Sequence, residues 1–155
     1  MIFIGAVIIS ATIFMLRSNN QEDMKSVQKS IDNKSEIING KIFSSDYSII
    51  SILPDSQERW DPTEDDVFKA EELMSVCLKE KKAAFFEILY QYTRQYFGIV
   101  EEGNKIIWVN AFLDDGNFDW KENVVYVLDG GDSFFNVKVD LVNQTCTEVR
   151  VNGVS

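Results

Sequence analysis

The sequence predicts an α+β domain: one amphipathic helix packed on a four- to five-stranded antiparallel meander sheet, preceded by an N-terminal hydrophobic helix. Three observations lead to this prediction. Residues 1–16 carry no charge, residues 62–81 have the pattern of a capped amphipathic helix, and apolar and polar residues alternate in the segments near the C-terminal end. Strands joined by short turns pair most simply as an antiparallel meander, so the apolar face of the sheet is expected to lie under the helix.

The helix is expected over residues 62–81. Asp61 can cap it, Pro62 suits the first helical position, and Glu64 stands three residues after the cap. Acidic residues fill positions 64–66 and lysines fill positions 79, 81 and 82, so the charges complement the helix dipole. The expected apolar stripe consists of Val67, Ala70, Leu73, Met74 and Cys77.

The sheet is expected to come from the segments that follow the helix. The expected strands are 90–100, 105–112, 124–128, 133–141 and 147–151, with turns at 101–104, 129–132 and 142–145. In the fourth of these strands, Phe135, Val137, Val139 and Leu141 face one side, whereas Asn136, Lys138 and Asp140 face the other. A helix on such a meander is broadly like a cystatin-type roll, a likeness of fold that carries no activity.

The chain is expected to have three parts. Residues 1–16 form a hydrophobic signal or anchor segment, residues 17–41 a polar spacer, and residues 42–155 a single α+β domain. Within the domain, residues 42–53 are expected to form a strand or an extended segment that stops before Pro54.

The uncharged N-terminal segment predicts targeting to a membrane. A helix over residues 1–16 would extend about 24 Å, short of the ~30 Å hydrocarbon core, which fits a signal peptide or a short anchor. Arg17 and Lys25 follow the segment and no basic residue precedes it, so the positive-inside rule would keep the domain cytoplasmic. A start that had lost a basic region would reverse this orientation. The alternative is a buried core helix, which would need a larger protein around it.

Composition excludes several classes of chemistry. The chain has 25 acidic and 15 basic residues, a formal charge of −10, so no nucleic-acid partner is expected. It contains no histidine, which removes Ser-His-Asp and Cys-His nucleophiles and the commonest metal ligand. Cys77 and Cys146 cannot make a four-ligand zinc site unaided. We therefore expect no catalytic residues, no metal ligands and no cofactor.

An acidic loop has some features of a calcium site. Asp115, Asn117 and Asp119 stand at alternate positions, as in the start of an EF-hand loop. That loop requires glycine at the sixth position and glutamate at the twelfth, where this chain has Trp120 and Tyr126. A solvated loop is the preferred interpretation.

The two cysteines suggest a disulfide, but strand parity argues against it. Cys77 belongs to the inner face of the expected helix. Cys146 shares parity with Glu148 and Arg150, which places it on the other face of the sheet. The sequence therefore favours unpaired cysteines, although a position at the strand end could bring the two together.

Two further groups of residues have a functional and a structural interpretation. Four aromatic residues, Tyr92, Tyr96, Trp108 and Trp120, could line a ligand cavity between helix and sheet. Aromatic residues in strands more often pack in the core or pair across strands. Glu101 and Glu102 could act as acid and base, but adjacent carboxylates in a turn are most simply a hydrophilic turn.

Several segments carry a family resemblance. They are Tyr92–Tyr96, Asn104–Asn110, Trp120–Gly131, Phe134–Asp140 and Val151–Gly153, which contain the pattern RQY, KIIWVN, VLDGG, FFNVKVD and VNG. This pattern resembles one that recurs in a family of small uncharacterised bacterial proteins. The resemblance implies the sheet and a bacterial source, and it assigns no activity and no functional residues.

The leading functional hypothesis is a non-enzymatic, membrane-anchored or exported domain that contacts a protein partner. The alternative is a binding module for a small hydrophobic ligand, held in a cavity between helix and sheet. An enzyme that relies on carboxylates alone would need two buried carboxylates facing each other across a cleft. The side of the membrane and the oligomeric state stay open.

Overall fold

The computed structural model describes residues 39–49, 52–54 and 56–153. These residues belong to one compact unit. The hydrophobic segment 1–16 and nearly all of the expected spacer lie outside the described residues. Within the described ranges, no helix combines the length and the apolar character that crossing a membrane requires.

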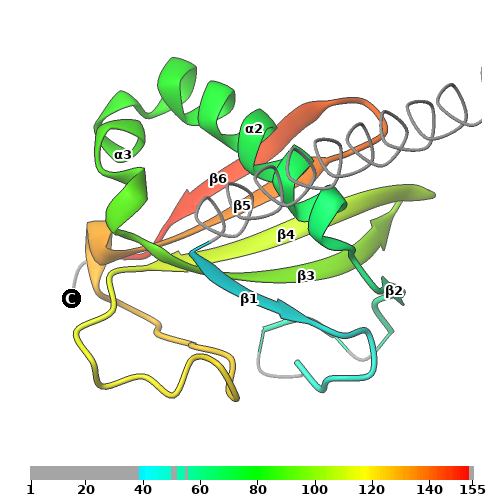
Figure 1. The fold of residues 1–155 in the computed structure, drawn as a ribbon, viewed down its shortest axis with the longest axis horizontal. Helices are drawn as coiled ribbons and strands as arrows, with labels where there is room; N and C mark the ends of the chain where they lie inside the picture. Colours follow the sequence, from blue (N-terminus) through cyan, green and yellow to red (C-terminus); the bar gives the residue numbers. More distant parts are fainter. Residues whose placement is uncertain (1–38, 50–51, 55, 154–155) are drawn as a thin grey trace, which may run out of the picture. The chain divides into compact units, whose positions relative to one another are not determined.

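The fold is α+β, with one main helix on a mostly antiparallel sheet (Figure 1). The strands are β1 (Gly40–Phe43), β2 (Arg59–Trp60), β3 (Thr93–Glu101), β4 (Asn104–Phe112), β5 (Phe134–Asp140) and β6 (Thr145–Val151). Their order is β1-β3-β4-β5-β6, and β2 also pairs with β3. The expected meander is confirmed in β3 to β6. The sheet has six strands rather than four or five, because β1 and β2 add to the outer edge of β3.

Strands β1 and β2 lie end to end along β3. β1 is parallel to β3, whereas β2 pairs antiparallel with Gly98 and Ile99. A Cβ atom at Gly98 would lie 2.2 Å from the carbonyl oxygen of Trp60, so glycine is needed where β2 approaches. The segment 42–53, expected to be a strand or an extended segment, is a strand only as far as Phe43 among the described residues. After that residue the chain turns, and Asp61 accepts a hydrogen bond from the Ser45 amide.

Helix α2 (Glu64–Lys81) begins two residues later than expected. Thr63 is the N-cap, because its hydroxyl accepts from the amide of Asp66 while the Asp66 carboxylate accepts from the Thr63 amide. The expected cap, Asp61, instead holds the preceding loop. The apolar stripe is confirmed, with Val67, Ala70, Met74 and Cys77 buried and Leu73 partly buried.

Two short helices precede β3 where a strand was expected. They are α3 (Ala83–Glu87) and a 3-10 turn at Leu89–Gln91, so the strand starts at Thr93 rather than at residue 90. The ring of Phe85 in α3 packs edge-on against that of Phe135 in β5. This contact closes the end of the core beyond α2.

The sheet has two covered faces (Figure 1). We call the face under α2 and α3 the helix face. Phe135, Val137, Val139 and Leu141 are buried in its core, as expected. The opposite face, which we call the loop face, is covered by residues from two loops, among them Tyr47, Ile49, Ile52 and Leu53 of the first and Val124 of the second. Its apolar core contains Phe43, Ile49, Phe97, Ile99, Ile106 and Trp108.

Candidate functional site

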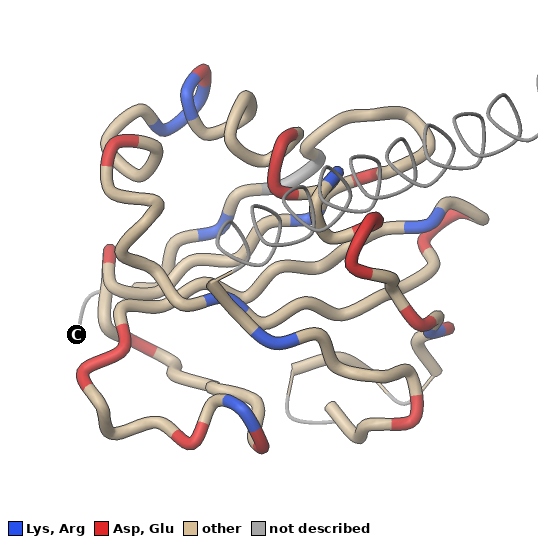
Figure 2. The backbone as a smooth tube through the Cα atoms, in the orientation of Figure 1, with Lys and Arg blue, Asp and Glu red and all other residues tan. Residues whose placement is uncertain are grey.

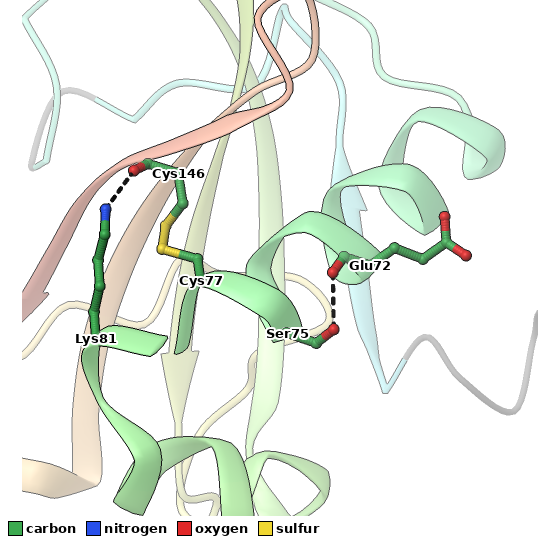
Figure 3. The surroundings of a disulfide bond; sticks show 5 residues. All are labelled: Glu72, Ser75, Cys77, Lys81 and Cys146. Carbon is green, nitrogen blue, oxygen red and sulfur yellow. Dashed lines mark hydrogen bonds between the residues drawn. A yellow bond between two sulfur atoms is a disulfide. The ribbon is translucent and has the colours of Figure 1, made fainter. Parts of the chain in front are cut away.

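A disulfide joins α2 to the last strand (Figure 3). Cys77 and Cys146 are bonded, with their Cα atoms 5.9 Å apart. The Lys81 ammonium, one helical turn beyond Cys77, donates a hydrogen bond of 3.1 Å to the Cys146 carbonyl oxygen. The C-terminal half of the helix is thus attached to β6 at two points.

The sequence-based argument against this bond was wrong because β6 contains a bulge. Lys138 pairs with Glu148, but the next residue of β5, Val139, pairs with Cys146. One residue of β6 is therefore extra, and an extra residue reverses the alternation of side chains beyond it. Cys146 consequently shares the helix face with Val139 and meets Cys77.

A buried ion pair links the helix to β3. The Arg94 Nε and the Tyr96 hydroxyl both lie near Glu71 Oε1, at 3.0 Å and 2.8 Å. Arg94 also donates to the carbonyl oxygens of Leu89 and Tyr92. The side chains of Glu71 and Arg94 are only 7% and 4% exposed, so the two charges depend on one another.

Burial shifts the pKa values of Glu71 and Tyr96 in this cluster. Desolvation raises the pKa of the Glu71 carboxyl above its ordinary value, although Arg94 and Tyr96 oppose the shift. Desolvation and the nearby carboxylate also raise the pKa of Tyr96. The cluster lies inside the helix–sheet layer. Among the described residues the buried carboxylates are Glu71 and Asp140, and they belong to opposite faces of the sheet.

A ladder of amide side chains crosses the loop face. Asn110 Nδ2 donates to Gln95 Oε1 at 3.1 Å, and Asn136 Nδ2 donates to Asn110 Oδ1 at 2.8 Å. These residues belong to β3, β4 and β5 and are direct neighbours in the sheet. Such a ladder satisfies polar groups that the covering loop would otherwise leave unpaired.

Gln95 attaches the loop to the ladder. Its Nε2 donates to the carbonyl oxygens of Trp120 and Asn123 at 2.8 Å and 2.7 Å, and its Oε1 accepts from the Val125 amide. Asn110 donates further to the Val125 carbonyl oxygen. The segment 124–128 is consequently not the strand that its β-branched residues predicted, because side chains of the sheet take its backbone hydrogen bonds.

Two adjoining hollows open on the loop face, and together we call them the second-face groove. Their volumes are about 140 Å³ and about 130 Å³. Both are lined by Ile52, Trp108 and Asn136. The first also reaches Asn110, Val125, Tyr126, Val127, Phe134 and Asn152, and the second reaches Leu53, Lys138 and Arg150.

Two residues that line the groove carry polar groups without a partner in the described part of the protein. Trp108 is 8% exposed, and its indole N–H has no hydrogen-bond partner among the described residues. The same holds for Asn136 Oδ1, whereas Asn136 Nδ2 donates one of its two hydrogens to the ladder. No buried side-chain nitrogen or oxygen of the described part lacks a partner, so both atoms must reach open space. Both residues line both hollows.

Charged residues are distributed unevenly along the chain (Figure 2). The loop 113–130 that borders the groove is mainly acidic, with Asp114, Asp115, Asp119, Glu122 and Asp129 against a single lysine. At the other end of the groove, the Lys138 ammonium lies 2.6 Å from Glu101 Oε1. Glu101 thus forms an ion pair across the sheet.

The structure separates the aromatic residues that were considered together. Tyr92 and Tyr96 are buried on the helix face, whereas Trp108 lies on the loop face and Trp120 in the covering loop. The layer between α2 and the sheet is filled by buried side chains such as Met74. A further hollow, of about 170 Å³, lies outside that layer and is lined by residues 45–49, 53, 54, 57 and 59.

The acidic loop is built from turns. Asp114 and Asp115 accept hydrogen bonds from the amides of Gly116 and Asn117, two residues further on. Asp119 accepts from the Asn123 side chain. Within the described residues, no group of three or more acidic or cysteine side chains is arranged to hold a metal ion.

Comparison of the chain with protein-family models, with curated proteins and with solved structures finds no match. The candidate site is therefore defined by its own geometry.

Replacing Gln95 with leucine should loosen the covering loop. The substitution removes the groups that bond Trp120, Asn123 and Val125, so hydrogen–deuterium exchange at the Val125 amide should accelerate about tenfold or more. Gln91→Leu is the matched control, since Gln91 is exposed and bonds only the neighbouring Tyr90 side chain. Equal exchange in both variants would contradict the role of the ladder.

Replacing Arg94 with methionine should destabilise the fold strongly at neutral pH. The change leaves Glu71 buried without its cation, and the free energy of unfolding should fall by about 3–5 kcal/mol in urea titrations at pH 7. The double variant Glu71→Met/Arg94→Met should recover most of this loss. A double variant no more stable than the single one would refute the pairing.

The decrease in the free energy of unfolding that Arg94→Met causes should depend on pH. A carboxyl whose folded-state pKa is raised contributes stability that is present below its unfolded pKa, near 4.5, and is lost as pH rises through the folded value. The deficit of Arg94→Met should therefore shrink as pH falls from 7 towards 4.5. Urea titrations across this range check the sign.

Proposed function

We propose that the chain is a membrane-anchored or exported domain that contacts a protein partner and has no catalytic role. The observation that carries this proposal is the second-face groove, where Trp108 offers a donor and Asn136 an acceptor without a partner in the described part of the protein. Tyr126, which lines the groove, is 52% exposed, and Leu128, two residues further along the chain, is 78% exposed. Aromatic and aliphatic side chains near polar groups of this kind are suited to protein contact.

The disulfide supports an extracytoplasmic location for the domain. Such bonds persist in oxidising compartments and are rare where thiols are kept reduced. Cys77 and Cys146 are the two cysteines of the chain, and they are paired. This evidence outweighs the literal count of positive charges after residue 16, which would keep the domain in the cytoplasm.

The alternative function is the binding of a small hydrophobic ligand between helix and sheet. The buried side chains that fill this layer do not favour it, and a ligand would have to displace residues such as Met74. The likeness to a cystatin-type roll is likewise a proposal, supported by one long helix on an antiparallel meander. It would assign no activity.

The cysteines should be oxidised in cells that express the full-length chain. A maleimide carrying a polyethylene-glycol tag, added under denaturing conditions after an acid quench, should add no mass before reduction and two tags after it. The Cys77→Ser variant should take one tag without reduction. Two tags on the unreduced wild-type chain would contradict an extracytoplasmic location.

Protein contact can be tested by photocrosslinking in intact cells. The photoreactive residue p-benzoylphenylalanine in place of Tyr126 should give covalent adducts with another protein. Val76 on α2 is the matched control, because it is 57% exposed but belongs to the helix on the opposite face. Absence of adducts from position 126, or equal yields from both positions, would refute the proposed function.

A further inference from the structure

We infer that the second-face groove binds an extended peptide segment through the main-chain peptide groups of its partner. The inference rests on the proposed function and names the chemistry of the contact. Its basis is a pair of solvent-accessible groups on residues that line the groove, the N–H of Trp108 and the Oδ1 of Asn136, neither of which has a hydrogen-bond partner in the described part of the protein. A peptide chain supplies both a carbonyl acceptor and an N–H donor.

The direction of the amide ladder fixes which groups of Asn136 are left for a ligand. Gln95 Oε1 must accept, because the Val125 amide is a donor, and Gln95 Nε2 must donate to two carbonyl oxygens. Asn110 Nδ2 therefore points to Gln95, which leaves Asn110 Oδ1 to accept from Asn136 Nδ2. The Oδ1 of Asn136 and the second N–H of its Nδ2 are left for a ligand, so the side chain can accept from a ligand N–H and can also donate.

The indole N–H of Trp108, the donor of the pair, is fixed in position by packing of its ring. The ring of Trp108 packs against that of Phe97, with centroids 5.3 Å apart, and the residue is 8% exposed. Trp108 and Asn136 lie on neighbouring strands, each offset by two residues from the direct partner of the other. Diagonal neighbours of this kind have Cβ atoms about 7–8 Å apart. This spacing suits a ligand that presents a donor and an acceptor in succession along its length.

The surroundings favour a peptide over an N-acetylated sugar, which also has an amide. The groove lining includes aliphatic side chains, Ile52, Leu53 and Val127, which suit aliphatic side chains of a peptide. The Trp108 and Asn136 groups are neutral, and the two cationic residues that line the groove, Lys138 and Arg150, both have interactions within the protein. The recognition is therefore by hydrogen bonding and apolar contact.

The indole N–H signals of the three tryptophans provide the test. The full-length chain labelled with 15N is titrated with the capped peptide acetyl-Ala-Leu-Ala-N-methylamide. The Trp108 indole signal should shift saturably, and the Trp108→Phe variant assigns that signal by its loss. The Trp60 indole signal should stay in place, since its N–H already donates to the Ile99 carbonyl oxygen at 3.0 Å.

A matched ester ligand differs from the peptide in lacking one donor, the N–H of its leucine residue. The same peptide with an ester in place of the leucine N–H should bind about 2- to 10-fold more weakly, the effect of one hydrogen bond. The Asn136→Ala variant should bind the two ligands equally. Lys79→Gln on α2 is the control variant and should keep the full preference for the amide.

Three results would overturn the inference. They are the absence of a saturable Trp108 shift, equal affinity of the wild-type chain for amide and ester, and a shift produced by N-acetylglucosamine but not by the peptide. Failure here and failure of the proposed function are distinguishable. Crosslinking at position 126 without peptide binding would support the protein contact and refute recognition of main-chain peptide groups. Peptide binding without crosslinks would support recognition of peptide groups and refute the protein contact in cells.

Discussion

The six-stranded sheet has apolar side chains on both of its faces, so it has to be covered twice. An amphipathic helix covers one face, since its stripe can be buried without leaving backbone groups unpaired. Irregular loops cover the other face, and their backbone groups must find partners that no regular element provides. Gln95 and Asn110 meet this need from within the sheet, at positions where a purely apolar face would carry hydrophobic side chains.

Much of the architecture follows from local patterns in the sequence. The stripe of α2, the alternation in β5 and the turn between β3 and β4 each depend on residues close together in the chain. At that turn, Glu102 and Gly103 both have positive φ angles, 52° and 80°, as expected for a tight hairpin that ends in glycine. Patterns of this kind are independent of distant partners, and here the sequence was a reliable guide.

The features that could not be predicted depend on pairing between distant segments. An extra residue in β6 leaves no mark in the alternation of that strand, yet it decides which face Cys146 occupies. Glu71 stands four residues after Val67, on the apolar stripe, so its position was a usable sign of a buried charge; its partner Arg94 gave no such sign. Of the residues around the groove, Trp108 packs in a core, as the preferred interpretation of the strand aromatic residues has it, but on the face away from α2. Asn136 lies on the polar face of its strand, as expected.

Because of the bulge in β6, the disulfide can form only when β5 and β6 pair in the correct register. If β6 slipped by one residue, or formed without its extra residue, the thiol of Cys146 would be on the side of the sheet away from α2. Oxidation would then have no partner within reach. Closure of the bond therefore requires the last strand pairing of the fold to be in register, and a misaligned chain would keep two free thiols.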